Sequence, residues 1–178
     1  VNNNVTTLAA QSMGNLTYVN TGNLTIGVVN PTGISATGSV NITVQSGDIS
    51  VTEAITTTSN SSSAIVLNAG STTAAGISTG GNILISGNGS VTTGSAGRVT
   101  LFTGSVANST GVTDLVGSGS GRFRYNSNAT TNGYNITAAP LGTGIYAIYR
   151  EQPTLTISTA NASIVYGNTV STTITTAT

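Results

Sequence analysis

The stretch Gly38-Ser39-Val40-Asn41-Ile42-Thr43-Val44, followed by Gly47-Asp48-Ile49-Ser50-Val51, decides the fold of this chain. In each segment a glycine and a polar residue precede apolar residues that alternate with Thr, Ser or Asn. Successive side chains of a strand point to opposite faces, so this alternation predicts a strand with one apolar face. We expect Ile49 and Val51 to share a face and Ser50 to point the other way. Glycine before each strand suits the positive φ of a tight corner.

Segments of the same form recur along the chain. They are Gly14-Asn15-Leu16-Thr17-Tyr18, Gly22-Asn23-Leu24-Thr25-Ile26, Gly81-Asn82-Ile83-Leu84-Ile85, Gly89-Ser90-Val91-Thr92 and Gly97-Arg98-Val99-Thr100-Leu101-Phe102. Short strands at such spacing fit a sandwich, a barrel or a solenoid. The likeness between segments favours a parallel β-solenoid (β-helix), whose strands stack about 4.8 Å apart, and Asn beside glycine can form ladders between them. A Greek-key sandwich stays the alternative, and no segment has the periodicity and caps of a helix.

Composition limits the function classes open to this chain. Its 178 residues include four Arg, four Asp or Glu, and no Lys, His, Cys or Trp, so the net charge is zero. Phosphate binding needs clustered cations, so nucleic acid is not an expected partner. No window approaches the roughly 20 apolar residues of a membrane span, so membrane insertion is not expected either. Disorder is disfavoured because 37% of the residues are hydrophobic, with many Val, Ile and Thr.

The repetition weakens after Phe102, which suggests how the chain is organised. We expect residues 1–150 to form the solenoid region, with a less regular, loop-like closing section at 103–150 that ends in a strand at Ile145–Tyr149. Residues 151–178 are expected to begin a partial, β-sandwich-like second module or to provide exchanged strands. Val1 opens directly into Asn-rich sequence, so we expect an internal or processed segment of a longer protein.

Residues 14–153 resemble a segment of very large filamentous-haemagglutinin-type adhesins of Gram-negative bacteria. The most distinctive stretches are Gly119-Ser120-Gly121-Arg122-Phe123-Arg124-Tyr125-Asn126-Ser127 and Ile145-Tyr146-Ala147-Ile148-Tyr149-Arg150-Glu151-Gln152-Pro153. Residues 154–178 look like the start of a mostly-β, glycine-containing module, marked by Ala160-Asn161-Ala162-Ser163-Ile164-Val165-Tyr166-Gly167. The resemblance implies secretion, a parallel β-helix and an extracellular place on the bacterial cell surface. It carries over no binding specificity.

The residue inventory argues against catalysis and against a metal site. Without His, Lys or Cys, acid–base chemistry falls to four carboxylates, or to Ser and Tyr with no evident base. Asp48 and Glu53 would point to opposite faces of an unbroken strand. Asp114 is isolated, although a hard cation prefers several carboxylates. Gly117-Ser118-Gly119-Ser120-Gly121 is read as a tight or flexible corner, because the phosphate-binding pattern around it is missing. No cofactor and no metal are predicted.

Arg122, Arg124 and Tyr125 form the most compact polar and aromatic cluster. One interpretation is a site for a glycan or a carboxylate, in which Tyr stacks and Arg donates in pairs. The alternative is an end cap, in which Arg binds exposed carbonyls. Arg150 and Glu151 are expected to make a surface or junction contact. The frequent Asn-x-Ser/Thr sequons, such as those at Asn15 and Asn23, suit ladder or turn roles better than glycosylation.

The favoured function is a non-catalytic structural or adhesive segment of a secreted bacterial surface protein. Its partners would be flanking domains or neighbouring copies, and surface glycans or host and abiotic surfaces. The first alternative is a subunit of an extracellular filament, joined head-to-tail through C-terminal strands. The candidate assembly residues are Leu155, Ile157, Ile164, Val165, Tyr166 and Ile174. A polysaccharide-acting β-helix enzyme is the distant alternative.

Overall fold

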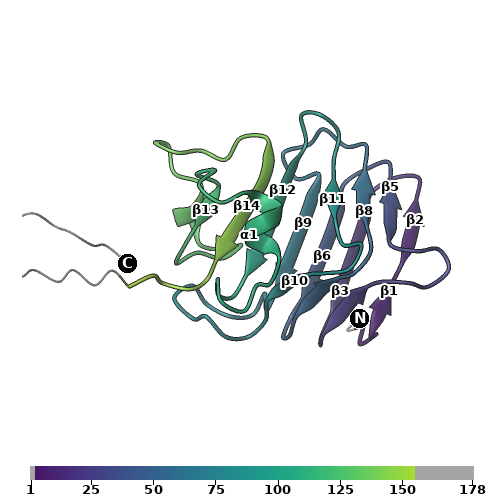
Figure 1. Cartoon of the computed structure of the whole chain (residues 1–178), viewed down its shortest axis with the longest axis horizontal. Coiled ribbons are helices and arrows are strands. Elements are labelled where there is room, and N and C mark those ends of the chain that lie inside the picture. Colours follow the sequence, from purple (N-terminus) through teal and green to yellow (C-terminus); the bar gives the residue numbers. More distant parts are fainter. Residues whose placement is uncertain (1–2, 155–178) are drawn as a thin grey trace, which may run out of the picture.

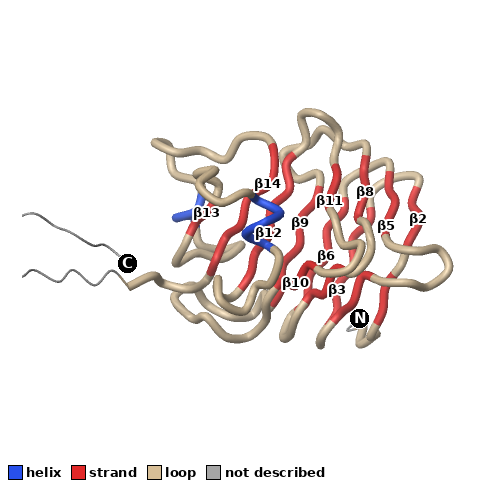
Figure 2. The backbone as a smooth tube through the Cα atoms, in the orientation of Figure 1, coloured by secondary structure: helices blue, strands red, loops and turns tan. Residues whose placement is uncertain are grey.

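A computed structural model describes residues 3–154 of the chain. Strands dominate these residues, and helix is confined to two short segments (Figure 2). The strands form three sheets, and every pairing between two named strands is parallel. The prediction of an all-β chain with parallel strands is therefore confirmed. The candidate assembly residues between Leu155 and Ile174 and the sandwich-like segment lie outside the described residues.

Successive strands along the chain belong to the first, second and third sheet in turn. The first sheet consists of β1 (Thr7–Leu8), β4 (Leu24–Ile26), β7 (Ile49–Val51) and β10 (Ile83–Ile85). The second consists of β2 (Ala10–Ser12), β5 (Ile34–Ala36), β8 (Ile55–Thr57) and β11 (Val91–Thr92). The third consists of β3 (Leu16–Asn20), β6 (Val40–Val44), β9 (Ile65–Ala69), β12 (Arg98–Thr103), β14 (Gly144–Tyr149) and β13 (Phe123–Arg124). Three successive strands, one from each sheet, are called a rung below, and rungs follow one another along the long axis (Figure 1).

The rungs stack in register, and their apolar residues form one continuous core. In the third sheet, Val40 pairs with Leu16 on one side and with Ile65 on the other. Ile49 and Val51 are fully buried and Ser50 is partly exposed, as the alternation predicted. Burying each Val, Leu or Ile side chain contributes about 1.5–3 kcal/mol. Many hydroxyl- and amide-bearing residues of the same strands, such as Ser35 and Asn41, are exposed, which explains how a surface with so few charges stays polar. Asn20, Thr57 and Thr103 are buried instead.

Segments that are neighbours in sequence do not stack on each other. Leu16–Asn20 and Leu24–Ile26 resemble each other, yet they lie in the third and the first sheet. A strand instead pairs with the strand three positions later, as β4 does with β7. Of the second sheet, β11 was among the recurring segments, whereas β2, β5 and β8 were not, because brief polar stretches carry little periodicity.

The glycines that open the segments serve mainly close approach rather than positive φ. Gly47 and Gly81 do have positive φ, at 126° and 148°, but Gly14, Gly38 and Gly89 do not. A Cβ on Gly38 would lie 2.7 Å from the carbonyl carbon of Gly14 in the neighbouring rung. The predicted role of these glycines is therefore wrong at most positions, because the rungs' backbones approach too closely at their corners for a side chain to fit.

The part of the chain after β12 departs from the regular order. It contains the helix α1 (Val112–Val116), strand β13, the 3-10 helix η1 (Asn132–Tyr134) and finally β14, which inserts between β12 and β13. The predicted strand at Ile145–Tyr149 is confirmed by β14, but the expectation of no helix is wrong at α1. A helix this short shows no sequence periodicity. The division at residue 150 stays a prediction.

Candidate functional site

The third sheet extends beyond the other two at the C-terminal end of the stack. Strands β14 and β13 follow β12, whereas the first and second sheets end at β10 and β11. Helix α1 lies opposite this extension and packs against β14 and β10. Its residues Val112 and Val116 are buried in the main core. The backbone N–H of Ile85 in β10 donates to the carbonyl of Thr110 at 2.8 Å, so the α1 segment also caps the first sheet.

The arginines of the predicted cluster lie against Tyr146. The guanidinium carbons of Arg122 and Arg124 are 5.9 and 5.8 Å from its ring centroid. Arg124 also donates to the carbonyl of Phe123 at 2.9 Å and to that of Ala139 at 3.0 Å. A cation near an aromatic ring is attracted by the partial negative charge of the ring face. These contacts tie the edge strand β13 to β14 and to the loop that precedes it, as the cap interpretation requires.

Tyr125 belongs to a different cluster from the two arginines. Its ring stacks on that of Tyr149, with centroids 5.5 Å apart and planes 15° apart. Phe123 also lies against Tyr149, at 6.3 Å and 19°. Because side chains alternate along a strand, Phe123 and Tyr125 share the inward face and the arginines the other. The structure therefore separates the three predicted residues onto two faces.

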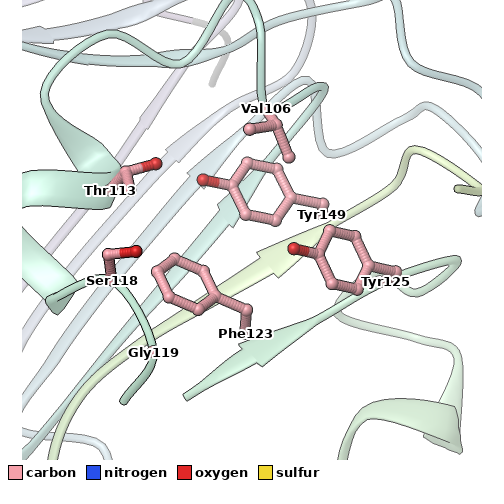
Figure 3. Close-up of a pocket in the computed structure, with 7 residues that line it drawn as sticks. All are labelled: Val106, Thr113, Ser118, Gly119, Phe123, Tyr125 and Tyr149. Carbon is pink, nitrogen blue, oxygen red and sulfur yellow. The ribbon is translucent and has the colours of Figure 1, made fainter. Parts of the chain in front are cut away.

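A pocket of about 240 Å³ opens between the inward face of β13 and β14 and helix α1 (Figure 3). Its lining consists of Val106, Thr113, Ser118, Gly119, Phe123, Tyr125 and Tyr149. Gly117, Gly119 and Gly121 have positive φ, which confirms the predicted tight corner beside it. Of these residues the sequence had singled out only Tyr125 and the glycine corner. No sequence pattern links Phe123 with Tyr149, since their contact depends on the insertion of β14.

Tyr149 is the most deeply placed residue of the pocket. Its side chain is fully buried, and its hydroxyl has no hydrogen-bond partner within residues 3–154. Burial raises the pKa of Tyr149, because the charged phenolate is disfavoured away from water, while the nearby Thr113 hydroxyl acts in the opposite direction. An unsatisfied buried hydroxyl costs about 1–3 kcal/mol. The phenol is therefore kept neutral, with the Thr113 hydroxyl as the polar group beside it.

A second cavity, of about 180 Å³, lies on the outer face of the third sheet, beneath the loop before β14. Phe102 and Tyr134 meet there edge to face, with ring centroids 5.4 Å apart. Arg98 donates from Nη1 to the carbonyl of Leu141 at 3.1 Å. Together with the buried Ile148, these contacts make a small satellite core that fastens the loop.

Arg150 is buried, so of the expected surface or junction contact the surface alternative is wrong for this residue. Its guanidinium donates to the backbone carbonyls of Ala69, Thr79 and Gly81. Burial lowers the pKa of Arg150, because the cation has left water. Three carbonyl dipoles take the place of a carboxylate, so Arg150 joins the end of β9 to the loop before β10.

Three of the four carboxylates bind backbone or amide groups individually. Asp48 accepts from the N–H of Asn82 at 2.7 Å, Glu53 from the Asn88 amide at 3.3 Å, and Glu151 from the N–H of Val106 at 2.7 Å. Asp114 is exposed on α1. Within residues 3–154, no three His, Cys, Asp or Glu gather into a potential metal site.

Asp48 belongs to a ladder that runs from Asn23, before β4, to Ser105, after β12. Asn23 accepts from the N–H of Asp48 at 2.8 Å, Asp48 from that of Asn82, and Asn82 from that of Ser105 at 3.0 Å. Asn15 likewise accepts from the N–H of Ser39 at 2.8 Å. The predicted ladder role of Asn beside glycine is confirmed at these positions. Side-chain oxygens thus satisfy backbone donors at the corners, where no strand pairing is available.

Comparison of the chain with protein-family models, curated proteins and solved structures gives no significant match. The resemblance to filamentous-haemagglutinin-type adhesins therefore stays a prediction. Across residues 3–154 the structure has no helix with the length and apolar character that a membrane crossing requires.

Proposed function

We propose that this chain is a parallel β-solenoid that acts as a stiff, non-catalytic shaft or adhesive segment of a secreted bacterial surface protein. The observation that carries the proposal is the in-register stacking of three parallel sheets around one continuous apolar core. Backbone hydrogen bonds between rungs run along the long axis, so the rod resists bending. Its outer surface of hydroxyls and amides carries little chemistry.

The carboxylates support a structural rather than a catalytic role. Polysaccharide-cleaving sites need two carboxyl groups that converge on one bond, about 5–10 Å apart. Here Asp48 is hydrogen bonded within the corner ladder and Glu53 to the Asn88 amide. The pockets described above have no carboxylate in their linings. We therefore assign no catalytic residues for the alternative of a polysaccharide-acting enzyme.

A specific observation favours the filament alternative. The outer edges of β1, β2 and β3 lie at the same end of the stack, and within residues 3–154 they are paired only at the bridge between Asn3 and Asn20. Open edges are templates for strand addition. A neighbouring copy could continue all three sheets there, which would make an open fibre.

Electron microscopy of the purified 178-residue chain tests the shaft against the filament. Short, uniform rods that stay the same length as concentration rises are expected for a shaft. Long fibres that grow with concentration would favour the filament subunit, and irregular globules would contradict both.

The proposed localisation has its own test: antibodies against the chain should label intact cells of the source organism. Labelling only after permeabilisation would overturn the surface assignment.

A further inference from the structure

The pocket beside Tyr149 exists because the third sheet extends further along the stack than the first and second sheets. In the regular rungs, the inward face of each third-sheet strand packs against strands of the first and second sheets. Strands β13 and β14 have no such partners, and α1 fills only part of the space opposite them. The cavity is thus the uncovered end of the interior column, bordered by the corner at Ser118 and Gly119.

Its walls combine aromatic faces with hydroxyl groups. The rings of Phe123 and Tyr125 lie nearly parallel to the ring of Tyr149. Figure 3 shows the hydroxyls of Thr113, Ser118 and Tyr125 directed toward the space that the rings border. Tyr125 is 41% exposed, so an approaching molecule can reach it from solvent. The pocket therefore offers a ligand a flat apolar surface together with several hydrogen-bond donors and acceptors at its rim.

The buried Tyr149 hydroxyl is a second, independent indication of a ligand. It lines the pocket, is fully buried and makes no hydrogen bond of good geometry among the described residues, the Thr113 hydroxyl being the polar group beside it. Buried polar groups in folded proteins nearly always have a partner, and those that lack one call for an explanation. A ligand hydroxyl that donated to Tyr149 or accepted from it would supply the missing bond.

We propose that this pocket binds one neutral sugar ring, such as the terminal residue of a glycan. No charged residue lines the pocket, so a charged ligand would be desolvated without a counterion. The C–H faces of a sugar are apolar and slightly positive, which suits the negative face of an aromatic ring. Its hydroxyls match those of Tyr149, Thr113 and Ser118. A volume of about 240 Å³ accommodates one ring rather than a chain of several.

The proposal does not depend on the shaft function, because a stiff rod would remain a rod with this pocket empty. Electron microscopy reports on the shaft, and ligand binding in solution reports on the pocket. Failure of one is therefore recognised separately from failure of the other.

Ligand-observed saturation-transfer NMR on the whole chain tests the proposal with neutral methyl glycosides of glucose, galactose, mannose and N-acetylglucosamine. We expect saturable binding of at least one of them, with a dissociation constant around the millimolar range typical of a few weak contacts. Methyl glucuronide, an anionic probe of similar shape, should bind at least several-fold more weakly. If no neutral glycoside binds, or if only p-cresol binds, the saccharide assignment is overturned.

Variants at two pocket residues, Tyr125 and Tyr149, locate the binding. Tyr125→Ala should weaken it at least tenfold because it removes the exposed stacking face, whereas Tyr125→Phe keeps the ring and should retain most of it. Tyr149→Phe should weaken binding several-fold without lowering the midpoint of thermal unfolding, since it removes an unsatisfied hydroxyl. Ile136→Ala and Tyr134→Phe, outside the pocket, are the matched controls. Equal effects of the pocket and control variants would overturn the site.

Discussion

At the scale of single residues, Arg150 shows how one buried cation can organise a corner without any carboxylate. The guanidinium donates to the carbonyls of Ala69, Thr79 and Gly81, which belong to segments on both sides of one loop. A neutral replacement would leave these buried acceptors without donors. The sequence predicted a surface or junction contact for Arg150, and the structure shows a buried contact between two segments.

Arg150→Met is expected to lower the free energy of unfolding by about 2–4 kcal/mol, because it leaves buried carbonyls unsatisfied. Urea unfolding followed by circular dichroism measures this. Arg122→Met is the control, since Arg122 is partly exposed and lies against the Tyr146 ring. It should cost less than about 1 kcal/mol. Similar losses in the two variants would contradict the special role of Arg150.

Tyr149 gives a prediction about alkaline pH. Its pKa in the folded chain is raised above the ordinary value of 10.0 by burial. Below pH 10 the folded and unfolded states both keep the proton, so the contribution to stability is fully present. As the pH rises from 10 through the raised pKa, the unfolded state loses the proton first, and the free energy of unfolding falls.

Urea unfolding at pH 9 and at pH 11 should therefore show a loss of stability that is smaller in Tyr149→Phe than in the unmodified chain. Tyr134→Phe serves as the control, because it removes a different phenol from the satellite core. An identical loss in Tyr149→Phe and in the unmodified chain would show that the Tyr149 phenol is not responsible.

At the scale of the structural elements, the corners between strands are as constrained as the strands themselves. Side-chain oxygens of Asn15, Asn23, Asp48 and Asn82 bind backbone N–H groups of the next rung. Glycines beside them let the backbones approach. The recurring glycine followed by a polar residue is thus a corner motif, and it explains why these pairs recur before strands of different sheets.

Gly14 and Gly38 precede paired strands in adjacent rungs and make a matched test. A Cβ on Gly38 would lie 2.7 Å from the Gly14 carbonyl carbon, whereas a Cβ on Gly14 meets nothing within 4 Å. Gly38→Ala should destabilise the chain by about 1–3 kcal/mol through overpacking. Gly14→Ala should be neutral, or should stabilise it by up to about 1 kcal/mol through reduced unfolded-state entropy. Thermal unfolding measures both, and the reverse order of stabilities would refute the corner contact.

At the scale of the whole molecule, stability is expected to vary along the stack. Each interior rung pairs with a rung on both sides, so its backbone hydrogen bonds are supported from both directions. The N-terminal end presents open strand edges, while at the C-terminal end the α1 segment caps the first sheet and packs against β14. The two ends are thus chemically different, and we expect local opening to begin at the N-terminal one.

Amide hydrogen exchange should find β6 and β9 the slowest to exchange, and β1 and β2 the fastest of the paired strands. Val112→Ala, which shortens a fully buried side chain of α1, should lower protection in β10 and β14 by the equivalent of about 1–3 kcal/mol. Protection in β3 and β6 should change little. A uniform loss in all sheets would instead show that the stack opens as one unit.

The sequence by itself determined the strands of the recurring segments and which side of each faces the core. Alternation in segments such as Val40–Val44 and Ile49–Val51 is a local property, because each residue's orientation follows from its position in the strand. The scarcity of charged side chains likewise limits the chemistry that the chain can perform, whatever its fold. These properties need no knowledge of distant contacts.

Only the tertiary structure decided which strands stack and where a pocket forms. The insertion of β14 between β12 and β13 brings Tyr149 against Phe123 and Tyr125, and it leaves part of their inward face uncovered. The physical reason is that pairing between strands depends on the path of the whole chain, which local periodicity does not encode.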